Sequence, residues 1–322
     1  MDLSPEGLIY LWYNLIWPLG RLLIFISIGL IVANIIESLN WTHRVAAIAR
    51  PLVRLGHFSE RVGAAFSIAI VSGVAANTML AEAYDKKEMS KKELILANLF
   101  NSLPTYFLHL PTVIVITLPL IKGAAFIYVG ITFTAALLRT ITIVIIGRFI
   151  LPKPEELVDI VPARQSKQDW PDILRKTWRR FKKRIRKIAL FTVPIYIIIF
   201  IMNRLQVFTL LESSMAEYLG FLPWLSPQAM GIITLHLAAE LTAGLAAAGA
   251  LLQDNILSYR EIIIALLIGN ILSSPLRAVR HQFPYYAGIF KPRLAIQLIT
   301  VNQAFRIFSI IIATSLYLIF TG

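Results

Sequence analysis

The chain has 322 residues, of which 57% are apolar, and its mean hydropathy is +0.70. Values this high exclude a soluble globular enzyme and indicate an integral membrane protein. The net charge of +13 lies largely in one linker, so we assign it to membrane topology and lipid headgroups and expect no nucleic-acid partner. With no cysteine, the sequence offers no disulfide, thiolate metal site or cysteine nucleophile.

The N-terminal region predicts one span and one surface helix. Aromatic residues gather in residues 8–17, which is typical of a membrane interface, and we expect a span over residues 19–33. Residues 43–61 carry four arginines and indicate an amphipathic helix on the cytoplasmic face. The first residues lack the basic region of a cleavable signal peptide.

Residues 62–84 are apolar, but Ser72, Gly73 and Asn77 interrupt them. Basic residues flank this segment on both sides. A single crossing would place one basic flank outside, against the preference of lysine and arginine for the cytoplasmic side. A re-entrant hairpin returns both flanks to one side, so we expect a hairpin here.

The next stretch occurs twice in the chain. The pattern Ser-x-x-Glu at Ser90 recurs 168 positions later at Ser258, and each copy predicts a capping box at a helix start. Each copy then runs apolar for about three turns and meets a proline beside polar residues, so we expect helix breaks at Pro104 and Pro275. Such a half-helix is about 20 Å long, and its broken end would lie deep in a hydrocarbon core of about 30 Å.

The rest of the chain predicts three more spans. Residues 124–151 return to the cytoplasmic side, where the linker 152–187 is densely basic. We expect this linker to form a solvated helix against anionic lipids. Spans at 188–202 and 294–320 and a second hairpin at 229–252 complete the second half.

Together these elements predict an all-α integral membrane protein with an inverted-topology repeat. Each half contains spanning helices, a re-entrant hairpin and a broken helix. Because each half crosses the membrane three times, the two halves have opposite orientations in the membrane. We expect a first membrane repeat at 1–151, a cytoplasmic linker at 152–187 and a second membrane repeat at 188–322, in the cell (inner) membrane.

Two arginines, Arg139 and Arg306, lie within predicted spans at matching places of the two halves. A charge inside the bilayer is costly unless it is paired or faces a cavity. The two could face a central cavity and balance the charge of a substrate. Alternatively, each guanidinium could hold the carbonyls freed by a broken helix, since it has five donors and no acceptor.

Glu240 is an acid inside an apolar run, and His236 precedes it by four residues, on the same face of a continuous helix. These two residues could couple transport to a proton or cation. Alternatively, Glu240 could form a buried ion pair with Arg277 or Arg280. Two metal ligands are also conceivable here, but no further ligand pattern converges on them, so we expect no metal site.

Polar residues mark the predicted breaks and bends, where unwound backbone could bind a polar solute. Alternatively, these side chains cap the helix ends beside them. No dinucleotide, P-loop, zinc-protease or serine-hydrolase motif occurs, so we expect neither an enzyme nor a cofactor. The candidate substrate-binding residues are Ser72, Gly73, Asn77, Asn101, Ser102, Arg139, Glu240, Thr242, Asn270, Ser273, Ser274 and Arg306.

Three motifs of the first half resemble a known family. They are Arg50-Pro51-Leu52-Val53-Arg54-Leu55-Gly56, Val71-Ser72-Gly73-Val74-Ala75-Ala76 and Met89-Ser90-Lys91-Lys92-Glu93. In them the chain resembles the nucleoside recognition (Gate) domain family. That family includes spore maturation membrane proteins, the membrane part of ferrous iron transporter B and, more distantly, concentrative nucleoside transporters. The resemblance covers most of both halves and implies that hairpins and broken helices frame a substrate site.

We therefore expect a Gate-type transporter that moves a small polar or anionic solute, nucleoside-like or other, by alternating access. Two alternatives stay open: a non-transporting scaffold or partner subunit like the spore maturation proteins, and a flippase of phosphate-bearing lipids. The expected partners are a small-molecule substrate and anionic lipids at the basic linker. Association into a homo-oligomer is also left open.

Overall fold

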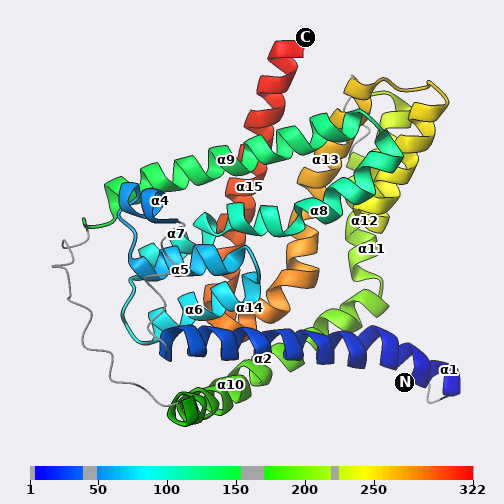
Figure 1. Cartoon of the computed structure of the whole chain (residues 1–322). Helices are drawn as coiled ribbons and strands as arrows, with labels where there is room; N and C mark the ends of the chain where they lie inside the picture. The colour runs from blue at the N-terminus through cyan, green and yellow to red at the C-terminus, as the bar shows by residue number, and fades with distance from the viewer. Residues whose placement is uncertain (1–3, 39–48, 154–169, 219–224, 322) are drawn as a thin grey trace. The chain divides into compact units, whose positions relative to one another are not determined.

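A computed structural model describes residues 4–38, 49–153, 170–218 and 225–321 of the chain. These residues are almost all helical, and no strand occurs among them (Figure 1). The elements are α1 (Pro5–Leu11), η1 (Trp12–Ile16), α2 (Trp17–Ser38), α4 (Arg50–Leu55), α5 (Glu60–Ala69), α6 (Gly73–Asp85), α7 (Lys91–Phe100), α8 (Ser102–Ile121), α9 (Ala124–Ile150), α10 (Trp170–Arg204), α11 (Val207–Tyr218), α12 (Pro227–Gln253), α13 (Tyr259–Arg277), η4 (Ala278–Gln282), α14 (Phe283–Phe290) and α15 (Pro292–Thr321), where η marks π-helical turns.

Five helical stretches of the described residues are long and apolar enough to cross a membrane. The chain is therefore an all-α, multi-pass membrane protein, as its composition predicts. The apolar part of α10, Ile188–Arg204, is shorter than these five and falls where another span was predicted. The five stretches are Pro5–Ile28, Lys91–Ile121, Ala124–Ile150, Tyr259–Phe290 and Pro292–Thr321.

The chain forms two compact units, and each unit draws on both halves of the sequence. The predicted domain division at the linker stays a prediction, because compactness and internal repetition are different criteria. Unit 1 comprises the described residues of Met1–Leu108, Thr140–Ile197 and Pro284–Leu298, and unit 2 those of His109–Arg139, Ile198–Phe283 and Ile299–Gly322.

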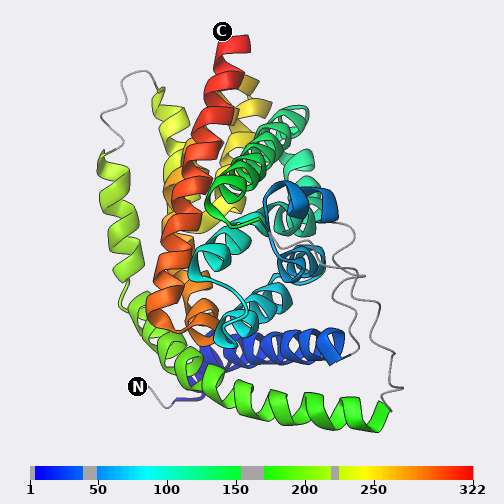
Figure 2. The ribbon, with the colours of Figure 1, turned by 90° about the vertical axis from the view of Figure 1, so that its left-hand side faces the viewer.

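In unit 1, residues 62–84 lie in two helices rather than one span. After α5 a short turn follows, and Ser72 starts α6 by accepting the N–H of Ala75 at 3.2 Å. The two helices pack against each other, and α6 also packs on α2 and α7 (Figure 2). The predicted segment is therefore a helical hairpin.

The single helix predicted over residues 43–61 lies partly outside the described residues, and its described part is interrupted. α4 ends before Gly56, and the chain turns at His57, whose φ is 54°. This turn brings Phe58 onto Phe100, with ring centroids 5.1 Å apart. A Cβ on Gly56 would lie 2.6 Å from the Phe58 ring. The prediction of one helix is wrong because packing of buried aromatic rings takes precedence over helix continuation.

The first repeated helix is interrupted three residues before the predicted place. α7 ends at Phe100 and α8 begins at Ser102, so Asn101 rather than Pro104 marks the interruption. Pro104 lies in the first turn of α8, where a missing N–H has little effect because these N–H groups have no intrahelical acceptor.

The second repeated helix does not break at Ser273, Ser274 and Pro275, so that prediction is wrong. α13 continues to Arg277 and passes into the π-helical turn η4, which leads to α14. Pro275 has no N–H for the carbonyl of Ile271, four residues earlier, and α13 nevertheless continues through it.

The two predicted capping boxes differ from each other. At α13, Ser258 Oγ accepts the N–H of Glu261, and the Glu261 carboxylate accepts the N–H of Ser258 at 2.9 Å. At α7, Ser90 Oγ accepts the N–H of Glu93 at 3.1 Å, but the Glu93 carboxylate accepts the N–H of Ser59 at 2.9 Å. The reciprocal half of the first box is therefore wrong, because Glu93 caps the start of α5 and ties the hairpin to α7.

In unit 2, α12 reverses its direction at Glu240. The φ of Glu240 is 68°, a left-handed value that a regular helix does not contain. A Cβ on Gly244 would lie 2.8 Å from the Cβ of His236, whereas eight residues of straight helix would separate them by about 12 Å. The segment predicted as the second hairpin, residues 229–252, therefore folds back on itself.

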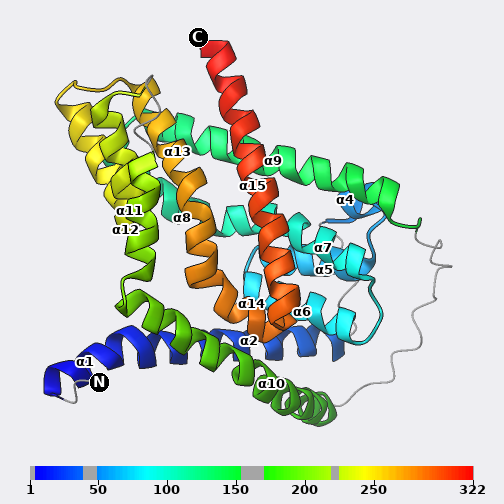
Figure 3. The same cartoon turned by 180° about the vertical axis from the view of Figure 1, so that it is seen from behind.

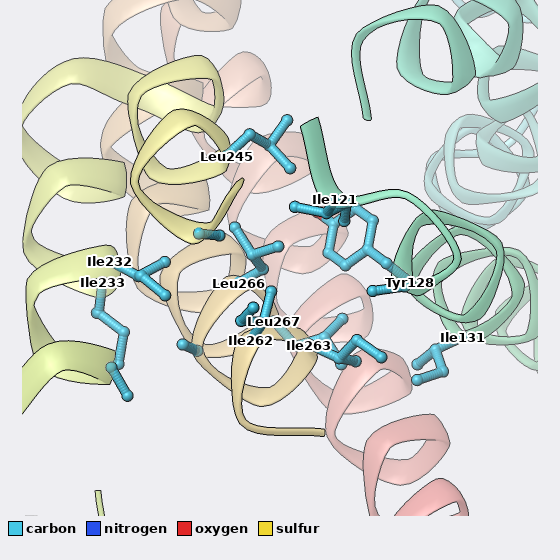
Figure 4. Close-up of a cluster of buried hydrophobic side chains, with 14 of the residues drawn as sticks. Ile121, Tyr128, Ile131, Ile232, Ile233, Leu245, Ile262, Ile263, Leu266 and Leu267 are labelled. Atoms are coloured by element: carbon cyan, nitrogen blue, oxygen red, sulfur yellow. The ribbon is translucent and has the colours of Figure 1, made fainter. Parts of the chain in front are cut away.

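Both arms of α12 contribute to one apolar core around α13 (Figure 4). Ile232 comes from the first arm and Leu245 from the second, and both are fully buried. Leu266 of α13 and Tyr128 of α9 belong to the same core. α11 packs on α12 in the same unit (Figure 3). The core holds the hairpin against the helix that carries Asn270, Ser273 and Ser274.

The turns that follow the two hairpins have the same backbone hydrogen bonds. The Lys87 N–H donates to the Tyr84 carbonyl, and 168 positions later the Asn255 N–H donates to the Leu252 carbonyl. The φ angles of the two donors are 60° and 54°. The neighbouring bonds also match. The Lys86 N–H donates to the Glu82 carbonyl, as the Asp254 N–H does to the Ala250 carbonyl. The Glu88 N–H donates to the Ala83 carbonyl, as the Ile256 N–H does to the Leu251 carbonyl. The repetition in the sequence is thus present in the local backbone.

α10 contains the basic part of the predicted linker. Residues 154–169 lie outside the described residues, and the helix begins at Trp170. Trp178 stacks on Phe181 with ring centroids 5.3 Å apart, and the Lys182 ammonium lies 5.3 Å from the Trp178 ring centroid. The predicted basic helix is therefore present from residue 170 on.

Candidate functional site

A buried polar cluster in unit 2 has Asn270 at its centre. The Asn270 Nδ2 donates to the Tyr128 hydroxyl at 3.0 Å. The Asn270 Oδ1 accepts from Nη2 of Arg306 at 3.0 Å and from Nη2 of Arg277 at 3.3 Å. Asn270 and Tyr128 are buried, and both arginines are half-buried. One neutral amide therefore bridges two cations inside an apolar unit.

Arg139 belongs to the same unit and is 8% exposed. The charge of Arg306 acts on Arg139, and that of Arg277 acts on Arg306, so Arg306 is repelled by both of the other guanidiniums. Among the described residues, neither Arg277 nor Arg306 forms an ion pair with a carboxylate. The predicted pair of arginines is thus part of a set of three.

The serines of α13 serve its packing. Ser274 Oγ donates to Oε1 of Gln303 on α15 at 2.6 Å, and both side chains are buried. Ser273 Oγ lies 3.5 Å from the carbonyl oxygen of Asn270, within its own helix. Of these two predicted site residues, Ser274 joins two helices and Ser273 stays in its own.

Glu240 lies at the turn of α12 and is not buried. Its Oε1 is 3.2 Å from Nε2 of His281, and both side chains are at least half exposed. The predicted pairing with His236 is wrong because the reversal at Glu240 removes the continuous helical face that it assumed. The alternative, a buried ion pair with Arg277 or Arg280, is also wrong, because Glu240 is exposed and its partner is His281. The charge of Glu240 still acts on Arg277 without an ion pair. Thr242, on the second arm, is exposed.

His236 is fully buried, and neither of its ring nitrogens has a hydrogen-bond partner among the described residues. The ring lies against Gly244 and Gly269. A Cβ on Gly269 would be 2.6 Å from Nδ1. Because Gly269 directly precedes Asn270, the imidazole lies beside the segment of α13 that carries the arginine-bridging amide.

Unit 1 has a second buried polar cluster, which carries no formal charge. Asn98 Nδ2 donates to Oδ1 of Asn77 at 3.0 Å and to the Tyr286 hydroxyl at 3.1 Å. Neither polar atom of the buried Asn101 side chain has a partner among the described residues. Of the predicted residues, Asn77 thus belongs to this cluster, whereas Asn101 lies buried at the interruption between α7 and α8.

The remaining predicted residues of unit 1 lie at helix starts. Ser72 caps α6, and Gly73 is its first residue, where an added Cβ would be 3.8 Å from Oγ1 of Thr105. Ser102 is the first residue of α8 and is partly buried. For Ser72 the capping role is the one that the geometry supports.

The sequence reasoning missed Tyr128, Asn98, Tyr286 and the bridging role of Arg277. Asn98 had a usable signal, because an amide inside the apolar run of α7 is the same feature that marked Asn270. Tyr128 had none, since a tyrosine near a span end indicates an interface residue, and Asn270 lies 142 positions away in sequence.

The fold and its clusters define a helical membrane protein with two polar interiors. Among the described residues, no group of three or more His, Asp and Glu side chains could hold a metal ion.

The chain is similar to three proteins of Methanocaldococcus jannaschii. It is 25% identical to "Uncharacterized protein MJ0871" over 88% of both chains, and 27% identical to "Uncharacterized protein MJ1556" over 91% of both chains. It is 22% identical to "Uncharacterized protein MJ0880" over 90% of this chain and 94% of that one. No family model and no solved structure matches the chain.

Proposed function

We propose that the protein is a Gate-type membrane transporter that moves a small polar or anionic solute by alternating access. The observation that carries this proposal is the pair of hairpins, each of which packs on a helix whose amide, Asn98 or Asn270, is the centre of a buried polar cluster. Polar groups inside membrane helices are expensive and usually serve binding or ion movement. Interrupted helices at matching places of two repeats are the common site of such binding in transporters.

The repeat itself supports this proposal. The turn of the first hairpin at Ser72 and that of the second at Glu240 lie 168 positions apart, as do the two matching turns that follow them. Positive φ angles also recur before the last helix of each half, at Lys122 with 48° and at Lys291 with 69°. We infer that the halves are inverted-topology repeats with re-entrant hairpins and that the basic linker is cytoplasmic.

The composition of the two units is in keeping with such a repeat. Unit 1 combines 1–108 with 284–298 of the second half, and unit 2 combines 198–283 with 109–139 of the first half. Each hairpin is thus completed by helices of the other half. Two related bundles of this kind are the parts that alternating access requires.

The test is uptake by proteoliposomes that contain the purified full-length protein. We expect uptake of at least one compound from a panel of phosphates, carboxylates and nucleosides, with or without ion gradients. The Arg306→Gln variant should lose that uptake, whereas Arg260→Gln, an exposed arginine of the same unit, should retain it. A flat panel would count against transport and favour a scaffold role.

A further inference from the structure

We propose that Arg277 and Arg306, with Asn270 between them, form a binding site for a phosphate-type oxyanion. The proposal names the chemical class of the transported solute. It rests on the proposed transport function only for the movement of the ligand across the membrane; binding of the ligand does not depend on that function. A phosphate group of a free solute and one of a lipid headgroup share the relevant chemistry.

Among the described residues, most hydrogen-bond donors of the two guanidiniums have no acceptor. Each guanidinium has five N–H donors. Arg277 and Arg306 each use one of them to donate to the same acceptor, Oδ1 of Asn270. The Nε of Arg277 is buried and has no partner among the described residues. Guanidinium forks match phosphate oxygens in pairs, so two converging forks suit an anion with several oxygens.

The charge of the cluster favours a dianion over a single carboxylate. Arg306 is repelled by both Arg139 and Arg277. The charge of Glu240 reaches Arg277, but this carboxylate is half exposed and paired with His281. A doubly charged phosphate would offset this repulsion more fully than a monoanion.

His236 supplies an independent observation. Its imidazole is fully buried, and neither nitrogen has a partner in the part of the chain that the structure describes, which is costly in an apolar core. The ring lies against Gly269, next to Asn270. A neutral imidazole carries one N–H donor and one acceptor. An oxyanion beside Asn270 would give that N–H the acceptor that the surrounding helices do not provide.

The first measurement is thermal unfolding of the full-length protein in detergent with inorganic phosphate, acetate or chloride at equal ionic strength. At roughly 100 times its dissociation constant, phosphate should raise Tm by a few degrees. Arg260→Gln, on the same helix but exposed, should keep the rise. Arg277→Gln and Arg306→Gln should lose it. An equal rise in all variants would overturn the site.

Asn270→Asp tests the proposal if the arginine variants fail to fold. This isosteric change puts a carboxylate between the two guanidiniums, where the neutral oxygen now lies. We expect a higher Tm without phosphate and no further rise with it. A phosphate response like that of the unmodified protein would overturn the proposal.

Mixed micelles distinguish the two sources of phosphate. Phosphatidic acid would identify a lipid headgroup as the ligand if it raised Tm while inorganic phosphate did not. Diacylglycerol should then leave Tm unchanged, and the Asn270→Asp variant should lose the rise. No rise with either probe overturns it. If the protein took up a solute but phosphate did not change Tm, transport would be supported and the oxyanion site would be excluded. If phosphate raised Tm but no solute were taken up, the oxyanion site would be supported and transport would not.

Discussion

At the scale of single residues, one amide holds the polar interior of unit 1 together. Asn98 donates to both Asn77 and Tyr286. In the Asn98→Ala variant, Asn77 and Tyr286 lose the N–H that Asn98 donates and keep only the hydrogen bond between their own side chains. We expect this loss to cost about 1–3 kcal/mol of unfolding free energy. Tyr286→Phe should cost less, because Asn98 keeps Asn77 as its acceptor. Thermal unfolding in detergent measures both.

The matched control is Asn203→Ala on α10, where the asparagine is exposed. This change should stay within about 0.5 kcal/mol of the parent. If Asn98→Ala were as mild as this control, the hydrogen bonds of the cluster would contribute nothing to stability.

Residue-scale prediction from the sequence succeeded where a polar group stands out against apolar neighbours. Arg139, Arg306 and Asn270 were found in this way, and the structure brings them into one unit. It failed for Arg277, because an arginine at the end of a span indicates a cytoplasmic rim. Only the packing of α13 against α15 reveals that Arg277 and Arg306 share an acceptor.

At the scale of elements, the second hairpin depends on two glycines that let His236 approach. A Cβ on Gly269 would lie 2.6 Å from Nδ1 and 2.9 Å from Cβ of His236, and the side chain cannot swing away from a clash at its own Cβ. We expect Gly269→Ala to lower Tm, although alanine favours helix by about 1 kcal/mol. The same swap at Gly231 of α12, with nothing within 4 Å, should raise Tm.

A double-mutant cycle separates the clash from other effects. Adding Gly269→Ala to His236→Ala should cost much less than adding it to the parent, since the imidazole that obstructs the Cβ is absent. Equal costs in the two backgrounds would show that His236 does not set the need for glycine.

The sequence predicted the elements unevenly, and the reason is local chemistry. The first hairpin was predictable because Ser72 and Gly73 interrupt an apolar run. At the second hairpin, the residue with φ of 68° is Glu240, and no glycine or proline marks it. A left-handed glutamate carries a steric cost that only the packing of both arms against α13 offsets. The predicted pairing of His236 with Glu240 was therefore wrong, because it assumed a continuous helix through Glu240.

At the scale of the whole molecule, the repeat of 168 positions was visible in the sequence, but the exchange of segments between units was not. Sequence similarity reports which residues were duplicated. Which helices pack together depends on contacts such as that of Asn98 with Tyr286, 188 positions apart. Internal repetition therefore predicts local backbone, such as the matching turns at Lys87 and Asn255, better than it predicts tertiary grouping.

The proposed inverted topology makes a prediction for two positions that correspond in the two halves of the repeat. Lys92 and Arg260 lie in the first turns of α7 and α13, 168 positions apart, and both are exposed. Since the chain has no cysteine, Lys92→Cys and Arg260→Cys each introduce a single thiol. A membrane-impermeant maleimide should label Arg260→Cys in intact cells and label Lys92→Cys only after permeabilisation, because the proposed topology places the basic flank of α7 on the cytoplasmic side. Labelling of both thiols from the same side would mean that the halves are parallel, and the alternating-access proposal would then lose its two-fold basis.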